Sequence, residues 1–117
     1  MGGSSEESEV SKATGTAVAL ACESLGYDVL ELLFQDNYKT LLPKLKNADI
    51  VFNALHGGVG ENGKIQTWMN DNRIFYTGSG PDASKLCMDK SRSKALARDL
   101  NITTADWELL DNIQDEP

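Results

Sequence analysis

His56 stands directly before a glycine-rich segment, where a titratable ring could act on a ligand. The segment from Gly57 to Gly63 carries the spacing GxGxxG, which is typical of dinucleotide binding when it follows a strand and opens a helix. Two features count against that interpretation. The segment follows an internal strand, and His56 and Glu61 place titratable groups in the loop. A structural hydrogen-bonding role for His56 stays open beside a functional one.

A second group of residues that could bind a ligand lies at the start of the chain. Gly2 and Gly3 allow a sharp turn and a close approach to a ligand. Glu6, Glu7 and Glu9 follow, and carboxylates near a helix start could bind an ammonium group. The alternative is that these charges only favour the N-terminus of a helix.

A third group combines a glycine turn with a lysine. The run Tyr76-Thr-Gly-Ser-Gly80 precedes Met88-Asp89-Lys90. If Lys90 opens a helix, its ammonium could reach a phosphate. The alternative is a solvated lysine beside Arg92 and Lys94.

Hydrophobic periodicity predicts the elements that must position these groups. Residues 1–9 and 57–63 are expected to be loops, and residue 26 is a glycine placed to end a helix. The expected helices are 10–25, 38–46 (weakened by Pro43), 65–72, and one or two over 83–88 and 90–100. The expected strands are 27–34, 49–55 and 74–77. This order predicts an α/β fold with a mainly parallel sheet, although no strand precedes the first helix. His56 then lies at the carboxyl end of a strand, where open α/β sheets bind ligands.

Composition bounds the function of the chain. Its 117 residues suit one domain, and 11 Lys+Arg against 18 Asp+Glu give a net charge of −7. So acidic a chain predicts neither a nucleic-acid nor an anionic-membrane partner. No apolar run approaches the ~20 residues of a membrane span, and the start lacks a secretory pattern. Cys22 and Cys87 are expected to be reduced, and a zinc site is not expected.

Taken together, the motifs resemble the N-terminal region of D-alanine–D-alanine ligases, members of the ATP-grasp superfamily. The matching strings are GGSSEESEVS, FNALHGGVGENGKIQ, YTGSG and MDKSRSK, in that order, followed by a segment around Trp107. The resemblance implies a Rossmann-like (pre-ATP-grasp) parallel sheet flanked by helices that lacks its first strand. It also implies that residues 1–100 form the N-terminal, substrate-side domain and that 101–117 begin the ATP-grasp region.

The resemblance also implies a role for five residues. Glu7 matches the glutamate that anchors the ammonium of the first D-alanine, and Val10 an apolar residue near its methyl group. His56 matches the histidine that lines this subsite, and Glu61 the supporting acid of the glycine loop. Lys90 matches a lysine that approaches the phosphates of ATP.

The implied reaction joins two D-alanines with ATP and Mg²⁺, through an acyl phosphate, to make the D-alanyl-D-alanine of peptidoglycan. The implied enzyme is cytoplasmic and homodimeric. This sequence ends where the family's two further domains would begin, so a truncated chain that is inactive alone and able to self-associate is expected. Four local departures are Asn62 for Asp, Thr67 for Gly, Phe75 for Pro, and Leu33 at an often acidic position. The alternatives are a free-standing module that pairs with a separate ATP-grasp chain, a nucleotide-binding domain, and a D-alanine–D-lactate ligase fragment.

Overall fold

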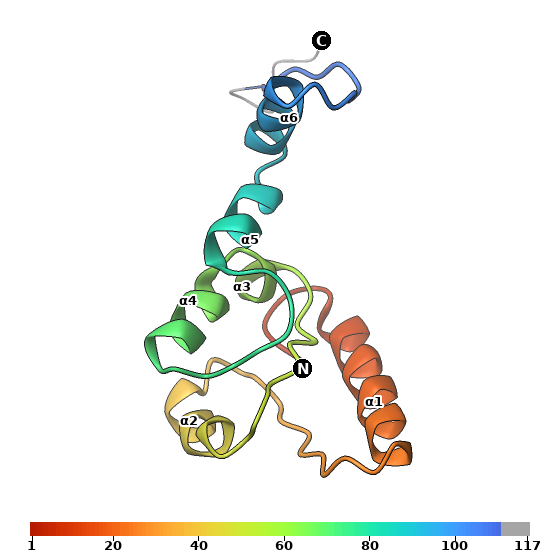
Figure 1. Cartoon of the computed structure of the whole chain (residues 1–117), viewed down its shortest axis with the longest axis vertical. Coiled ribbons are helices and arrows are strands. Elements are labelled where there is room, and N and C mark those ends of the chain that lie inside the picture. Colours follow the sequence, from red (N-terminus) through yellow and green to blue (C-terminus); the bar gives the residue numbers. More distant parts are fainter. Residues whose placement is uncertain (111–117) are drawn as a thin grey trace.

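A computed structural model describes residues 1–110 of the chain. Their helices are α1 (Ser8–Ser24), α2 (Tyr38–Lys46), α3 (Gly58–Glu61), α4 (Lys64–Asp71), α5 (Pro81–Met88) and α6 (Lys90–Asp99). The molecule is elongated, with extents of 51 × 31 × 29 Å. Helices α1 to α4 form one body, from which α5 and α6 extend as an arm (Figure 1).

The predicted helices are present, with small shifts at their ends. The long first helix begins two residues earlier than expected, and α2 continues across Pro43. The region from 83 to 100 forms two helices, because Asp89 takes an extended conformation between them. The Asp89 side chain accepts a hydrogen bond from the Arg92 amide at 3.0 Å and so caps α6.

The prediction of a loop over residues 57–63 is wrong in part, because this segment contains the single-turn helix α3. Gly57 (φ +65°) precedes this turn, and Gly63 (φ +89°) separates it from α4. This interruption removes the continuous strand–turn–helix on which a dinucleotide-binding interpretation of the GxGxxG spacing depends.

The predicted parallel sheet is not confirmed, because the described residues contain no strand of regular length. Segments 27–34, 49–55 and 74–77 are extended, but only two isolated parallel bridges form, Gly2 with Phe34 and Val51 with Tyr76. Segments 27–33 and 47–53 diverge on either side of the N-terminus (Figure 1). The backbone groups of a strand need a neighbouring strand as their hydrogen-bond partner. In the described residues, neither of the two bridges is extended by a further pair of residues into a strand.

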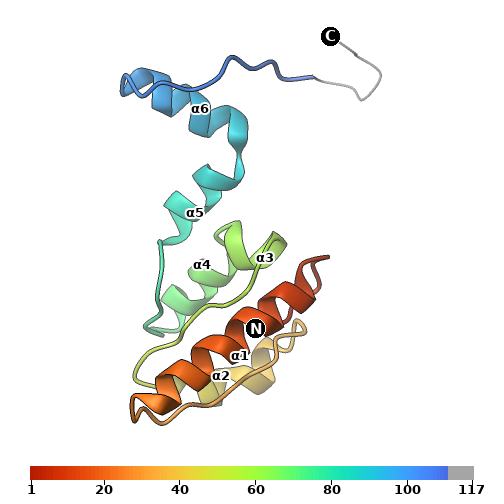
Figure 2. The same ribbon diagram turned by 90° about the vertical axis from the view of Figure 1, so that its right-hand side faces the viewer.

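The hydrophobic core lies among α2, α4 and the extended segments. Its buried members are Phe34, Leu41, Ile65, Met69 and Ile74. Tyr38 joins two aromatic neighbours at this core, with ring centroids 5.0 Å from Phe34 and 4.9 Å from Trp68. By contrast, α5 and α6 contain no buried residue; α5 contacts both α3 and α4, and α6 contacts α5 (Figure 2).

Candidate functional site

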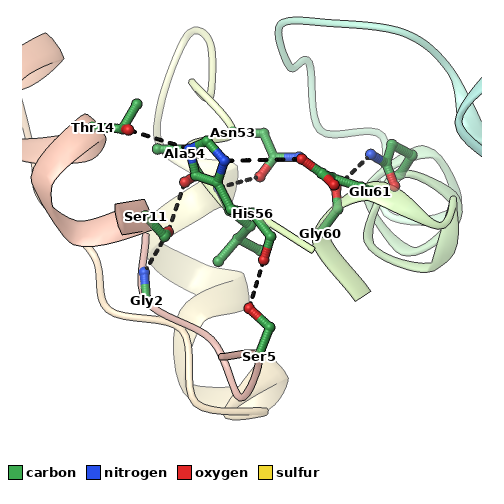
Figure 3. Close-up of polar contacts among 11 residues, drawn as sticks. Gly2, Ser5, Ser11, Thr14, Asn53, Ala54, His56, Gly60 and Glu61 are labelled. Carbon is green, nitrogen blue, oxygen red and sulfur yellow. Dashed lines mark hydrogen bonds and ion pairs between the residues drawn. The ribbon is translucent and has the colours of Figure 1, made fainter. Parts of the chain in front are cut away.

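Two glycine-containing segments, about 50 residues apart in the sequence, line a cavity of about 190 Å³. One is 2–5, the turn that leads into α1, and the other is 55–60, the turn between an extended segment and α3 (Figure 3). The volume is below the roughly 300–1,000 Å³ of pockets for drug-sized ligands, so it suits a small molecule.

Ser11 joins the two walls. Its side chain is fully buried (0% exposed). Its Oγ accepts a hydrogen bond from the Gly2 amide at 2.8 Å and donates one to the Ala54 carbonyl at 2.6 Å. A side chain of α1 thus replaces the ladder hydrogen bonds that a neighbouring strand would make.

A second set of contacts brings Glu7 to the glycine turn. Ser5 Oγ donates to the His56 carbonyl at 2.7 Å. At Gly57 an added β-carbon would lie 2.5 Å from Glu7 Oε2, and the positive φ of this residue also favours glycine. The Glu7 carboxylate therefore lies against the residue that follows His56.

The His56 ring lies between a hydroxyl and a carboxylate. Nε2 is 3.2 Å from Thr14 Oγ1, and Nδ1 is 4.0 Å from Glu61 Oε1. The side chains of His56 and Glu61 are 32% and 44% exposed. Thr14 did not stand out in the sequence, because a threonine inside a helix carries no motif signal.

Two amides hold the turn that carries Glu61. The Gly60 carbonyl accepts hydrogen bonds from Asn53 Nδ2 at 3.2 Å and from Gln66 Nε2 at 2.9 Å. Gly60 also packs directly on Leu55, so a larger residue there would collide with it. The sequence strings around His56 therefore include supporting residues as well as the site itself.

The structure does not bring all five predicted residues together. Of the five, only His56 lines the cavity; the Glu7 carboxylate lies against Gly57, a lining residue, and Glu61 faces the His56 ring. Val10 is 54% exposed on α1 and does not line the cavity. Lys90 is exposed at the start of α6, on the arm.

The charged groups at the cavity favour a cationic ligand group. Glu7 occupies the N-terminal boundary of the 17-residue helix α1, where a carboxylate is favoured by the helix dipole. Among residues 1–110, neither a lysine nor an arginine lines the cavity. An ammonium group placed beside Glu7 would gain a charge-assisted hydrogen bond.

The described residues do not fit a metal–nucleotide site. Within 1–110, no three His, Cys, Asp or Glu side chains gather in a way that could hold a metal ion. One exposed lysine on the arm does not form a phosphate cradle. In the same part of the chain, no helix is long and apolar enough to span a membrane. Cys22 and Cys87 are not joined in a disulfide.

Comparison with known proteins finds relatives of the chain. No family model matches the chain. A D-alanine--D-alanine ligase of Clostridium botulinum (strain 657 / Type Ba4) is 37% identical over 115 residues, which are 98% of this chain and 38% of that protein. One from Aquifex aeolicus (strain VF5) is 44% identical over 108 residues, 92% of this chain and 37% of that protein.

Solved structures agree with the sequence comparison. The crystal structure of a D-alanine--D-alanine ligase from Bacillus anthracis complexed with ATP matches with a TM-score of 0.85 and 34% identity. The match covers 100% of this chain and 38% of that one. The chain thus spans little more than a third of the length of the relatives it matches.

Proposed function

Since this chain is a relative of the D-alanine–D-alanine ligases that spans about 38% of their length, we propose that it forms the subsite for the first D-alanine of such a ligase. The observation that carries the proposal is the cavity between 2–5 and 55–60. Two motifs about 50 residues apart meet there, and both belong to the resemblance.

In this proposal each wall of the cavity has a task. Glu7 binds the ammonium of the first D-alanine, and His56 lines the subsite with support from Glu61. Val10 lies near the substrate methyl group, which requires the exposed Val10 side chain to be covered when the substrate is bound. The extended segments then correspond to strands of a parallel, Rossmann-like (pre-ATP-grasp) sheet.

The whole reaction needs groups beyond those described. The γ-phosphate of ATP passes to the carboxylate of one D-alanine, and the amine of a second D-alanine attacks the acyl phosphate and releases phosphate. Phosphoryl transfer depends on cations that neutralise the developing charge. Mg²⁺ and ATP would supply this chemistry with residues elsewhere in a ligase, and Lys90 contributes one ammonium toward the phosphates. We place the enzyme in the cytoplasm, as a homodimer.

D-Alanine binding to the 117-residue chain tests the subsite directly. We expect heat or chemical-shift changes on titration with D-alanine and weaker ones with L-alanine. Glu7→Gln should weaken binding about tenfold or more, because a hydrogen bond to a charged group is worth about 1.5–3 kcal/mol. Glu9→Gln is the matched control, since Glu9 is exposed and its carboxylate pairs with Lys12 on the surface of α1. Equal loss in both variants would contradict the anchoring role of Glu7.

Activity of the isolated chain provides a second test. We expect no D-alanine-dependent release of phosphate from ATP, because the described residues supply no metal ligands. Phosphate release by the purified chain would overturn this part of the proposal.

A free-standing module that pairs with a separate ATP-grasp chain is the second candidate. It is favoured by the end of the arm and the residues that follow it, where Leu96, Leu100 and Ile102 are exposed and available to a partner. Such a module would restore ligase activity when mixed with that chain, whereas neither chain alone would be active.

A further inference from the structure

The two nitrogens of the His56 ring both face protein groups, and these groups differ in what they can do. Glu61, when ionised, only accepts hydrogen bonds, whereas the Thr14 hydroxyl can donate or accept. The carboxylate lies on the Nδ1 side at 4.0 Å, a separation that suits an ion pair or a bridging water. The hydroxyl lies on the Nε2 side at 3.2 Å.

This asymmetry selects one tautomer of the neutral ring. A proton on Nδ1 points toward the acceptor Glu61, and Nε2 is then left as an acceptor. The Thr14 hydroxyl can donate to it. The opposite tautomer would turn a lone pair on Nδ1 toward a carboxylate, which is repulsive. Figure 3 shows the ring between these two contacts.

Hydrogen bonds near Thr14 and His56 join the two segments that make this contact. Thr14 is half-buried and lies one turn after Ser11, whose two hydrogen bonds tie α1 to Gly2 and Ala54. Ser5 separately holds the His56 backbone. The hydroxyl and the imidazole therefore come from two segments that are fixed against each other.

We propose that the Glu61 carboxylate selects the Nδ1–H tautomer of the neutral His56 ring, and that Thr14 is a positioning residue whose hydroxyl donates to Nε2 and so keeps the ring facing Glu61. This deepens the proposed function by naming what orients a wall of the subsite. The tautomer itself depends on neither D-alanine nor ATP, so it can be tested even if the proposed function is wrong.

The test uses nitrogen NMR of the 117-residue chain with ¹⁵N-labelled histidine, at a pH where the ring is neutral. His56 is the only histidine, so its signals need no assignment. We expect Nδ1 to carry the proton and Nε2 to be unprotonated. A dominant Nε2–H form in the unmodified chain would overturn the proposal without any variant.

Four variants separate the two contacts. Glu61→Gln replaces an acceptor-only group with an amide that can donate or accept, and should shift the tautomer ratio at least about fivefold toward Nε2–H, the size expected for one hydrogen bond. Thr14→Val removes the hydroxyl partner of Nε2 and should change the nitrogen shift of Nε2, and Thr14→Ser should restore that shift. Thr16→Val, the same change at an exposed site on α1, should alter neither the ratio nor the shift. An unchanged ratio in a folded Glu61→Gln variant, or an unchanged Nε2 shift in a folded Thr14→Val variant, would refute the assignment.

Discussion

At the scale of single residues, Ser11 has the largest expected effect on stability. Its hydroxyl satisfies a buried amide of the N-terminal turn and a buried carbonyl of the segment before His56. Both walls of the cavity thus depend on one oxygen atom, and a change there should disturb the site and the stability together.

We predict that Ser11→Ala lowers the free energy of unfolding by at least about 2 kcal/mol. Each buried group left without a partner costs about 1–3 kcal/mol, and this variant leaves two. Urea titration followed by circular dichroism measures the change. Ser24→Ala is the control, because Ser24 bonds only to Ala21 on the exposed surface of the same helix. A loss no greater than that of the control would mean that water replaces the Ser11 hydroxyl.

At the scale of elements, the end of α1 shows how one residue sets a boundary. The Gly26 amide donates to the Glu23 carbonyl at 2.9 Å, and the Tyr27 amide to the Cys22 carbonyl at 3.1 Å. This pair of bonds is the Schellman motif, which requires a left-handed residue, and Gly26 has φ +89°.

We predict that Gly26→Ala destabilises the chain by about 1 kcal/mol, because a side chain is disfavoured in the left-handed conformation. The space around Gly26 is open, so strain and not collision causes the effect. Gly80→Ala is the matched control, since Gly80 is equally open and has φ −70°. Equal urea midpoints for the two variants would contradict this explanation.

Tyr38, the first residue of α2, makes the stability of the chain depend on pH. Burial, followed by the nearby charge of Asp36, raises the pKa of Tyr38 above its ordinary value. Tyr38 therefore keeps its proton in the folded state at a pH where the unfolded state has lost it, and stability falls as the pH rises through the ordinary tyrosine pKa of about 10. Below that range the effect is absent.

The corresponding measurement is the urea midpoint at several pH values from 8 to about 11. We expect the midpoint of the unmodified chain to fall more steeply than that of Tyr38→Phe above pH ~10. Tyr27→Phe, at an exposed tyrosine, should keep the steep dependence of the unmodified chain. Parallel curves for the chain and Tyr38→Phe would show that another group is responsible.

At the scale of the whole molecule, the two parallel bridges leave backbone groups without partners. Phe34 bonds Met1 and Gly3, so alternate residues such as Leu30 direct their backbone groups to the same side. The backbone of Val51 forms hydrogen bonds with the segment around Tyr76. The backbone groups of its neighbours Ile50 and Phe52 therefore point away from that segment. Within residues 1–110, the amides of Leu30, Ile50 and Phe52 make no backbone hydrogen bond, and their side chains are exposed.

We predict that the chain self-associates through these edges, because unpaired edges with apolar side chains readily add strands. The average sedimentation coefficient should rise with concentration. Ile50→Lys should reduce the association, whereas Leu20→Lys, at an exposed apolar residue of α1, should not. A monodisperse monomer that unfolds sharply at high urea would contradict this expectation.

The sequence by itself determined what depends on neighbours along the chain. The periodicity of Ile65, Trp68 and Met69 predicted α4, and Gly26 marked the end of α1, because helix hydrogen bonds join residues four apart. The motif strings also indicated the resemblance to the ligases. The helical turn inside 57–63 was missed, because glycines disfavour helices intrinsically, and the bonds from Asn53 and Gln66 to Gly60 that support the turn come from outside it.

Only the tertiary structure decided what depends on distant partners. The extended segments were recognised, but a strand exists only if another segment pairs with it, and here most of their backbone groups remain unpaired. In the site, Thr14 and His56 are 42 residues apart, as Ser11 and Ala54 are 43 apart. No local pattern encodes such contacts, because packing α1 against the turn before α3 creates them.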